Sequence, residues 1–475
     1  MRPGPLPGRE QHAINPCPPV NRRTSTVALI LCTIALAGCA TVADAPATGE
    51  SASTTPAATA GPAKGAAPAA PPPANAAVAS RPTSPTGATA PGTPPNLATA
   101  PGAPRPFAEV IKDATEHAGL FRLYQKDDKT WLEIAPEQLD QPYFFSINLS
   151  SGIGEQWLFG GLMWDSDLVA FRKVGQQIHL VALNTHYFAN GAAESLAVRE
   201  AFSDSLLASV PIASAPHAER KSILIDASAL LLTDIPGGNG VLERTFRQPY
   251  TFDARNSSIT KTRSTPDLTA FNISAHYALA RVVQPPVTPG SVPFTQPPST
   301  VPDIRSLFLG YYYNFAKLPA EPMRPRLADD RIGYFGTWRF DYSNENKLTP
   351  RVNYVQRWRL EKKDPTVEVS EPKQPIVFWL DRDIPERYRK TIIDGVLEWN
   401  KAFERIGFKN AVAAKLQPTD ADFDTLDARH ASIRWMISAR PVFGGIGPRQ
   451  VDPRTGEILD ADIGTDPVRL RSRRI

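Results

Sequence analysis

Apolar and polar residues alternate along much of segment 107–365, and a period of two favours paired strands over helices. The clearest case is LTAFNISAHYALARV, residues 268–282, which predicts a strand with one apolar face. That face carries Phe271, Ile273, Ala275, Tyr277 and Leu279. The same period recurs in segments 121–134, 143–150, 168–183, 306–315 and 353–363. Several strands at this spacing predict an antiparallel sheet or sandwich.

Turn residues divide this region further. Segments 121–134 and 168–183 are predicted to be hairpins, with turns at Asp127–Asp128 and near Gly175. Helical patterns are fewer: one helix is expected at 192–209 and a short turn at 227–233. A proline-rich loop is predicted at 284–302.

No motif in 107–365 predicts an active site. The segment DIPGGNG, 234–240, is not followed by the Lys-Ser/Thr of a phosphate loop and is interpreted as a glycine turn. Asp253 and Arg255 are assigned to a solvated turn, and His179 and His186 to surface or satisfied histidines rather than ligands. The tyrosines at 311–313 point to alternate faces, which indicates sheet packing.

Composition excludes some classes of protein. The 475 residues carry a net charge of +4 without a compact Lys/Arg stripe, which argues against nucleic-acid binding. The three cysteines are Cys17, Cys32 and Cys39. The remainder of the chain can therefore form no disulfide and no cysteine-ligated metal site.

The first hundred residues look like an export signal and a tether. Arg22 and Arg23 precede an eleven-residue apolar core, and residues 1–39 are interpreted as a secretory signal. Leu36–Cys39 resembles the bacterial lipobox, so Cys39 is the predicted lipidation site, and Ala40 resembles outer-membrane sorting. The alternative to the lipobox is an ordinary signal with a chance cysteine. The long proline-rich stretch before Arg22 also leaves a wrongly assigned start codon open. Residues 40–106, rich in Ala, Pro and Thr, predict a disordered linker.

A different pattern begins near residue 375. Ile376–Leu380 is a continuous apolar run typical of a buried strand, and Asp383 is predicted to cap the helix that follows and ends at Gly407. Further strands are expected at Ala411–Leu416, Ser432–Ile437 and Glu457–Ile463. This order predicts half of an α/β domain.

Three segments carry a family resemblance: PIVFWLDRDIPERYRKTIIDGVLEWNKAFERIGFKNA, SIRWM and GPRQVDPRTGEILDADI. Together they resemble a family of large exported bacterial zinc-dependent metalloproteases with a metzincin-like catalytic domain. The resemblance covers nearly all of 107–463. It implies an α+β chain, in which a β-rich antiparallel domain of unknown function (107–365) precedes an incomplete metzincin-like α/β catalytic domain (375–463).

In that family a helix with H-E-x-x-H follows the last of these strands and binds zinc, with the glutamate as general base. The seven histidines here are His12, His117, His179, His186, His217, His276 and His430, and no two are four residues apart. No catalytic or metal-binding residue is therefore assigned, and no cofactor is predicted for this chain. Residues 464–475, with four arginines, are expected to be an atypical tail from a frameshifted or truncated gene; a short paralogue with a basic tail is the alternative.

The resemblance also implies a substrate strand. In metzincin-like domains the fourth strand forms the rim of the cleft, so Ile458, Leu459, Asp460, Ala461, Asp462 and Ile463 are the candidate edge that pairs with an extended peptide. The chain is interpreted as a truncated homologue of an exported metalloprotease, predicted inactive. The expected partners are the membrane, through the lipid anchor, and a peptide or protein substrate in the full-length family.

Two other functions are considered. The first is a cell-envelope lipoprotein that acts as a binding or scaffold module. The second is a hydrolase that uses the carboxylates Asp460 and Asp462 without zinc, which is less favoured because no partner acid or nucleophile is evident. Export to the cell envelope, with the folded part facing the periplasm, is expected in either case.

Overall fold

A computed structural model describes residues 104–284 and 297–472, which belong to one compact unit. The signal, Cys39, nearly all of the linker and most of the loop at 284–302 lie outside the described residues. The described part is β-rich, with mainly antiparallel sheets, and has the α+β class expected from the sequence. Within it, no helix is both long enough and apolar enough to cross a bilayer.

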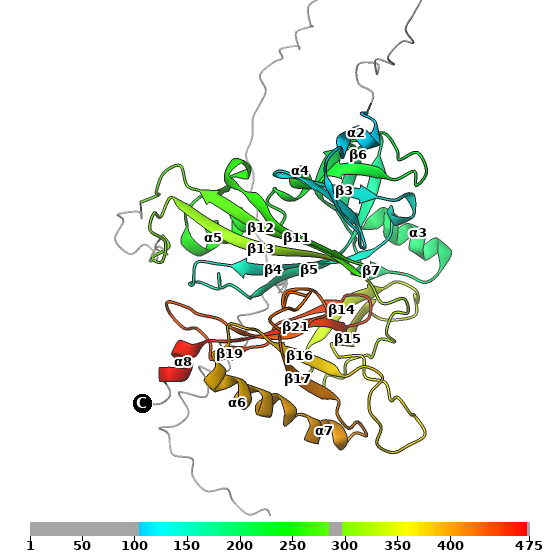
Figure 1. Cartoon of the computed structure of the whole chain (residues 1–475). Coiled ribbons are helices and arrows are strands. Elements are labelled where there is room, and N and C mark those ends of the chain that lie inside the picture. Colours follow the sequence, from blue (N-terminus) through cyan, green and yellow to red (C-terminus); the bar gives the residue numbers. More distant parts are fainter. Residues whose placement is uncertain (1–103, 285–296, 473–475) are drawn as a thin grey trace, which may run out of the picture. The chain divides into compact units, whose positions relative to one another are not determined.

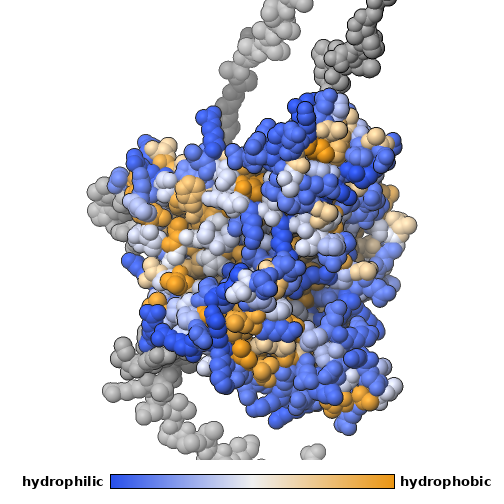
Figure 2. Space-filling view, in the orientation of Figure 1, coloured by the Kyte–Doolittle hydropathy of each residue, from blue (hydrophilic) through white to orange (hydrophobic). Residues whose placement is uncertain are grey.

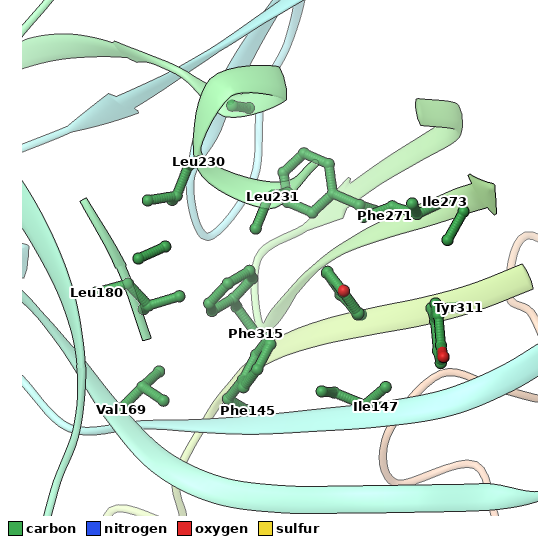
Figure 3. Packing of buried hydrophobic residues seen from close by; sticks show 14 of the residues in the cluster. Phe145, Ile147, Val169, Leu180, Leu230, Leu231, Phe271, Ile273, Tyr311 and Phe315 are labelled. Carbon is green, nitrogen blue, oxygen red and sulfur yellow. The ribbon is translucent and has the colours of Figure 1, made fainter. Parts of the chain in front are cut away.

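An eight-stranded antiparallel sheet forms the middle of this unit (Figure 1). Its order is β10 (Thr251–Phe252), β12 (Leu268–Ala278), β13 (Ser306–Lys317), β4 (Tyr143–Ser151), β5 (Met163–Val174), β6 (Gln177–Ala182) and β8 (Ser205–Pro211), with β11 (Ser258–Thr265) also paired to β12. The predicted apolar face of β12 is confirmed, because all five of its residues are buried in the main core. Figure 3 shows this core, where the rings of Phe145 and Phe315 stack at 4.7 Å.

Smaller elements surround the large sheet. One sheet contains β1 (Thr115–His117), β2 (Arg122–Lys126), β3 (Lys129–Ile134) and β9 (Ile223–Asp226), and another contains β15 (Arg351–Val355), β14 (Gly336–Asp341) and β7 (Tyr187–Phe188). The helices here are α2 (Phe107–Val110), α3 (Ala192–Ala201), α4 (Ala227–Leu231) and α5 (Gly238–Phe246), with 3₁₀ turns η1 (Pro136–Gln138) and η2 (Ala254–Asn256). Both predicted hairpins are present, as β2–β3 and β5–β6.

A six-stranded sheet is built from the C-terminal residues. Its order is β17 (Val412–Leu416), β16 (Ile376–Leu380), β18 (Ser432–Trp435), β21 (Glu457–Thr465) and β19 (Gly445–Ile446), with β20 (Arg449–Asp452) beside β21. The first four strands run parallel, whereas β19 and β20 are antiparallel to β21. Helix α6 (Glu386–Leu397) packs on one face, followed by α7 (Asn400–Glu404). Figure 2 shows apolar residues over this part of the unit, and Trp399 beside α7 is 65% exposed.

The two large sheets are joined through a buried polar layer. Asn148 of β4 and Asn314 of β13 are fully buried, and both side-chain amides donate to the carbonyl of Leu426, at 3.2 and 2.9 Å. Leu426, Ala428 and Leu459 cover the second face of the eight-stranded sheet. This second covering explains why Tyr311, Tyr312 and Tyr313 are all buried although they alternate in direction.

Several local predictions are wrong. Residues 205–211 form strand β8, although the helix predicted at 192–209 was expected to include its start. Ala208 and Val210, two positions apart, are buried, whereas Ser209 between them is exposed, which is the period of a strand. The glycine turn predicted at 234–240 is present only as far as Gly237, because helix α5 begins at Gly238. The amides of Gly238 and Asn239 donate to the Asp234 carboxylate at 2.7 and 3.0 Å. The strand expected at 353–363 begins earlier and is shorter, because β15 spans only Arg351–Val355.

Two corrections concern the C-terminal region. Helix α6 begins after Pro385 without a side-chain cap, so Asp383 is not its capping residue. The predicted end of the last strand at Ile463 is also wrong, because β21 continues to Thr465, and helix α8 spans Pro467–Ser472. The turn between them is ordered by Asp466, which is fully buried and accepts a hydrogen bond from the Ser438 hydroxyl.

Candidate functional site

The predicted edge strand Ile458–Ile463 lies inside the sheet. On one side, Asp462 and Ile463 of β21 pair with β18. On the same side, the Ile458 amide donates to Arg357 O at 2.9 Å. On the other side it pairs with β20 and then β19. Both sides of the strand are therefore occupied, and the assignment of 458–463 as an open edge is wrong. The prediction failed because the short strands β19 and β20, which lie just before β21 in the chain, were not recognised in the sequence.

The six predicted residues are consequently interior. Asp460 and Asp462 are fully buried, Leu459 and Ala461 are 7% and 9% exposed, and Ile458 and Ile463 are half-buried. Leu459 packs against the eight-stranded sheet, and Ile463 packs against the side of α6. None of them can meet a substrate strand without first displacing β19 or β20.

The open edge lies instead at β19. The Asp466 amide donates to Gly444 O at 3.2 Å, so the next residue, Gly445, directs its N–H and C=O away from β21. Gly445 is exposed. An edge strand with outward backbone groups is a template for pairing with another extended chain.

The glycines of this edge are not explained by local packing. A Cβ at Gly444, Gly445 or Gly447 would meet its nearest neighbour at 3.6, 3.7 or 3.9 Å, which is ordinary van der Waals contact. None of the three has a positive φ. A strand glycine without a steric or conformational reason favours a site that another backbone approaches closely.

An aromatic wall stands beside this edge. The indole of Trp157 is 45% exposed and stacks on Phe443 at 5.7 Å, and Phe159 contacts both rings. Trp157 sits in a tight turn closed by the bridge between Glu155 and Leu158. Phe443 directly precedes the glycine-rich edge, so the wall places apolar surface next to the free backbone groups.

The turn that carries Trp157 is strained. Gln156 and Trp157 have φ of 53° and 65°, a region that Asn and Gly adopt far more readily. The turn is held by Glu155, whose carboxylate accepts four hydrogen bonds of 2.6–3.2 Å from the amides and hydroxyls of Ser299 and Thr300. Strain that the surroundings hold in place is typical of binding sites. Sequence reasoning missed this wall, because its residues lie almost 290 positions apart.

The acids of β21 form a buried cluster behind the edge. Burial raises the pKa of Asp460 well above its ordinary value, and the charge of Asp462 raises it further. Burial also raises the pKa of Asp462 to about 6, against the opposing charge of Arg434. The Arg434 guanidinium itself pairs with Asp381 at 3.1 Å, and Ser432 donates to Asp462 at 2.5 Å.

Three oxygens of this cluster have no hydrogen-bond partner: Oδ2 of Asp460, Oδ2 of Asp462 and Oε1 of Gln450. Gln450 pairs with Asp460 in register, and its amide nitrogen donates to Ile147 O, Asn148 Oδ1 and Asp165 O at 3.1–3.3 Å. The cluster is closed to solvent, so its carboxylates cannot act on a bound peptide. This geometry gives no support to hydrolysis by the Asp460–Asp462 pair.

The described residues also do not fit a zinc site. Within residues 104–284 and 297–472, no three acidic, histidine or cysteine side chains converge in metal-ligand geometry. His430 stacks on Phe423 at 4.6 Å, and His186 contacts the carbonyl of Trp338 at 3.3 Å. His12 and Cys39 lie outside the described residues.

Two family models match parts of the chain. Residues 161–363 match the family model Domain of unknown function (DUF5117), and residues 104–152 match Domain of unknown function (DUF5118). Searches of curated proteins and of solved structures gave no match. Both family matches fall in the β-rich region, which is therefore similar to domains of unknown function.

Proposed function

We propose that the C-terminal sheet binds an extended peptide along Phe443–Gly447, as the substrate-binding part of an exported, metzincin-like metalloprotease. The observation that carries this proposal is the outward backbone of Gly445 in β19, at the end of a sheet whose first four strands are parallel. The fourth strand in chain order is β19, which supports the role that the resemblance gives to that strand. Backbone pairing would give affinity, and the wall of Trp157 and Phe443 would select an apolar side chain.

This chain is proposed to bind a peptide without cutting it. The zinc-binding motif of the resembled family is not in the printed sequence, and the described residues offer no substitute. A chain of this kind could still act in the cell envelope as a peptide-binding lipoprotein anchored through Cys39. Incorporation of a labelled fatty acid, lost in Cys39→Ser, would test the anchor separately.

Peptide binding is tested with synthetic decapeptides rich in apolar residues, each made with and without alternate backbone N-methylation. Methylation removes the amide donors of one strand edge and leaves the side chains in place. Fluorescence anisotropy should show binding of the unmethylated peptides and a loss of at least tenfold on methylation. Equal binding of both forms would contradict strand pairing.

A matched pair of variants places the site. Gly445→Pro removes the outward N–H without breaking a bond to β21, and proline is tolerated at such edge positions. Gly333→Pro makes the same change at a glycine with open space around it. Binding should fall in Gly445→Pro only. If both variants bind as the parent protein does, the peptide site lies elsewhere.

A further inference from the structure

Three side chains that are distant in sequence form a hydrogen-bonded chain at the surface of the eight-stranded sheet. Nδ1 of His276 in β12 lies 3.0 Å from Oδ2 of Asp253. Nε2 of the same ring lies 2.8 Å from Oγ of Ser306, the first residue of β13. The serine and the carboxylate therefore contact opposite nitrogens of one imidazole, the arrangement that activates a serine nucleophile.

The backbone fixes the carboxylate in this position. Strand β10 pairs with the end of β12, and the Asp253 amide donates to His276 O at 2.9 Å. The Asp253 carboxylate also accepts from the Arg255 amide at 3.1 Å and from Asn256 Nδ2 at 2.6 Å. The solvated turn expected at Asp253 is thus an ordered one that faces the imidazole.

These contacts determine the direction of the hydrogen bonds. The hydrogen bond from Asn256, followed by that from His276, lowers the pKa of Asp253, which keeps the carboxylate ionised. An ionised carboxylate only accepts hydrogen bonds, so Nδ1 of His276 must donate. In the neutral ring Nε2 is then the acceptor, and Ser306 Oγ–H donates to it. This is the tautomer that general-base activation of the serine requires.

The nucleophile is open to solvent. His276 is 9% exposed, whereas Ser306 is exposed and can be reached from outside. The ring of Phe308, 51% exposed, lies 4.8 Å from the imidazole and offers apolar surface next to the serine. A small ester with an apolar acyl or aryl group fits such an open site better than a long polymer does.

We propose that Asp253, His276 and Ser306 form an acyl-transfer site for small esters, separate from the peptide-binding edge. Ser306 Oγ forms a bond to the ester carbonyl carbon, and its proton passes to His276 Nε2. The bond from carbon to the leaving oxygen then breaks, and His276 returns the proton to the departing alcohol. Water repeats the sequence on the acyl-serine and releases the acid. Asp253 is a positioning residue, because it acts through the imidazole.

The experiment uses the full chain with two probes, a fluorophosphonate that labels activated serines and 4-nitrophenyl acetate. Mass spectrometry of the labelled protein should place the adduct on Ser306. General-base activation gives about 10²–10⁴-fold, so hydrolysis should fall by about 10² or more in Ser306→Ala. Ser258→Ala, an exposed serine on the neighbouring strand β11, is the matched control and should keep full activity.

Asp253→Asn separates catalysis from folding, because the amide keeps the size of the side chain but disfavours the required tautomer. It should slow both labelling and hydrolysis at least tenfold while the far-UV circular dichroism stays unchanged. If the parent protein is not labelled at Ser306, or hydrolyses the ester no faster than Ser306→Ala does, the three residues only order the turn and the proposal fails.

Discussion

The hydroxyl of Tyr312 donates a hydrogen bond of 2.7 Å to Oδ1 of Asp427, across 115 residues of chain. Tyr312 lies in the middle of β13, and Asp427 lies in the loop that leads into β18. Asp427 also forms an ion pair with Arg263 of β11. One buried carboxylate thus links two strands of the large sheet to the C-terminal sheet.

Tyr312→Phe is expected to lower the free energy of unfolding by about 1.5–3 kcal/mol, since the hydrogen bond is made to a charged acceptor and both groups are buried. A double-mutant cycle with Asp427→Ala, which removes the acceptor, isolates the pair when measured by urea unfolding. The coupling energy should be clearly above zero. Additive effects would mean that Tyr312 stabilises the protein through its ring alone.

Two leucines of the large sheet should differ in how much stability the protein loses when each is replaced by alanine. Leu180 of β6 is fully buried in the main core, and Leu206 of β8 is 57% exposed. Leu180→Ala should cost about 2–5 kcal/mol, because it leaves a cavity. Leu206→Ala should stay within about 0.5 kcal/mol of the parent protein. Thermal unfolding of both variants checks the assignment of the two faces.

The strained turn predicts a stabilising substitution. At φ of 53°, Gln156 adopts a conformation that costs roughly 1–2 kcal/mol for a residue with a Cβ. Gln156→Gly removes this cost, partly offset by the greater freedom of glycine in the unfolded chain. Urea unfolding should show a gain of about 0.5–1 kcal/mol. A loss of stability would show that the Gln156 side chain makes a necessary contact.

The buried acids predict how stability depends on pH. The pKa of Asp460 and that of Asp462 are raised by burial, the latter to about 6, above the ordinary value of about 4. Between about pH 4 and pH 6 the folded state therefore binds more protons than the unfolded state does. Stability contributed by these groups should fall as pH rises through this window.

Asp460→Asn tests that dependence directly. It should raise the free energy of unfolding at pH 7.5 by about 1–3 kcal/mol, because at that pH the folded state must either bury the charge of Asp460 or hold a proton that the unfolded chain releases. It should also flatten the decline between pH 4 and 6. Asp303→Asn is the control, since Arg305 lowers the pKa of that exposed carboxyl to about 2 and its removal brings no gain. A destabilised Asp460→Asn would point to a cation that balances the cluster.

Local patterns predicted most of the strands. The hairpin at 121–134 could be read from its alternation and from Asp127–Asp128, where Asp127 has φ of 52°. Helix α5 was missed because its segment was interpreted as a glycine turn and its first amides are bound by Asp234, four residues before the helix begins. Strands β19 and β20 were missed because glycines surround β19 and the two strands hold only two and four residues. Because these two strands were missed, β21 was predicted to be the edge strand of the sheet, whereas the edge strand on that side is β19.

The site depended on contacts that no local pattern contains. Trp157 meets Phe443, and Gln450 meets Asn148, only because the C-terminal sheet covers the large sheet. The same holds for Asp253, His276 and Ser306, each of which has an ordinary structural interpretation when considered alone. Period-two alternation identified β12 and β13 but not their register, which brings His276 opposite Phe308.

The hydrogen bond from Gln450 to Ile147 O spans 303 residues, which has a consequence for protein synthesis. A ribosome that adds about 5–20 residues per second needs roughly 15–60 s to deliver the partner of β4. The last strand of the large sheet, β13, ends at Lys317, and 133 residues separate it from Gln450. For roughly 7–27 s of synthesis, therefore, the polar side chains of Asn148 and Asn314 remain hydrated on a sheet whose own strands are complete. The large sheet must therefore persist half-covered on the nascent chain, where a chaperone can bind the face that the last strands later occupy.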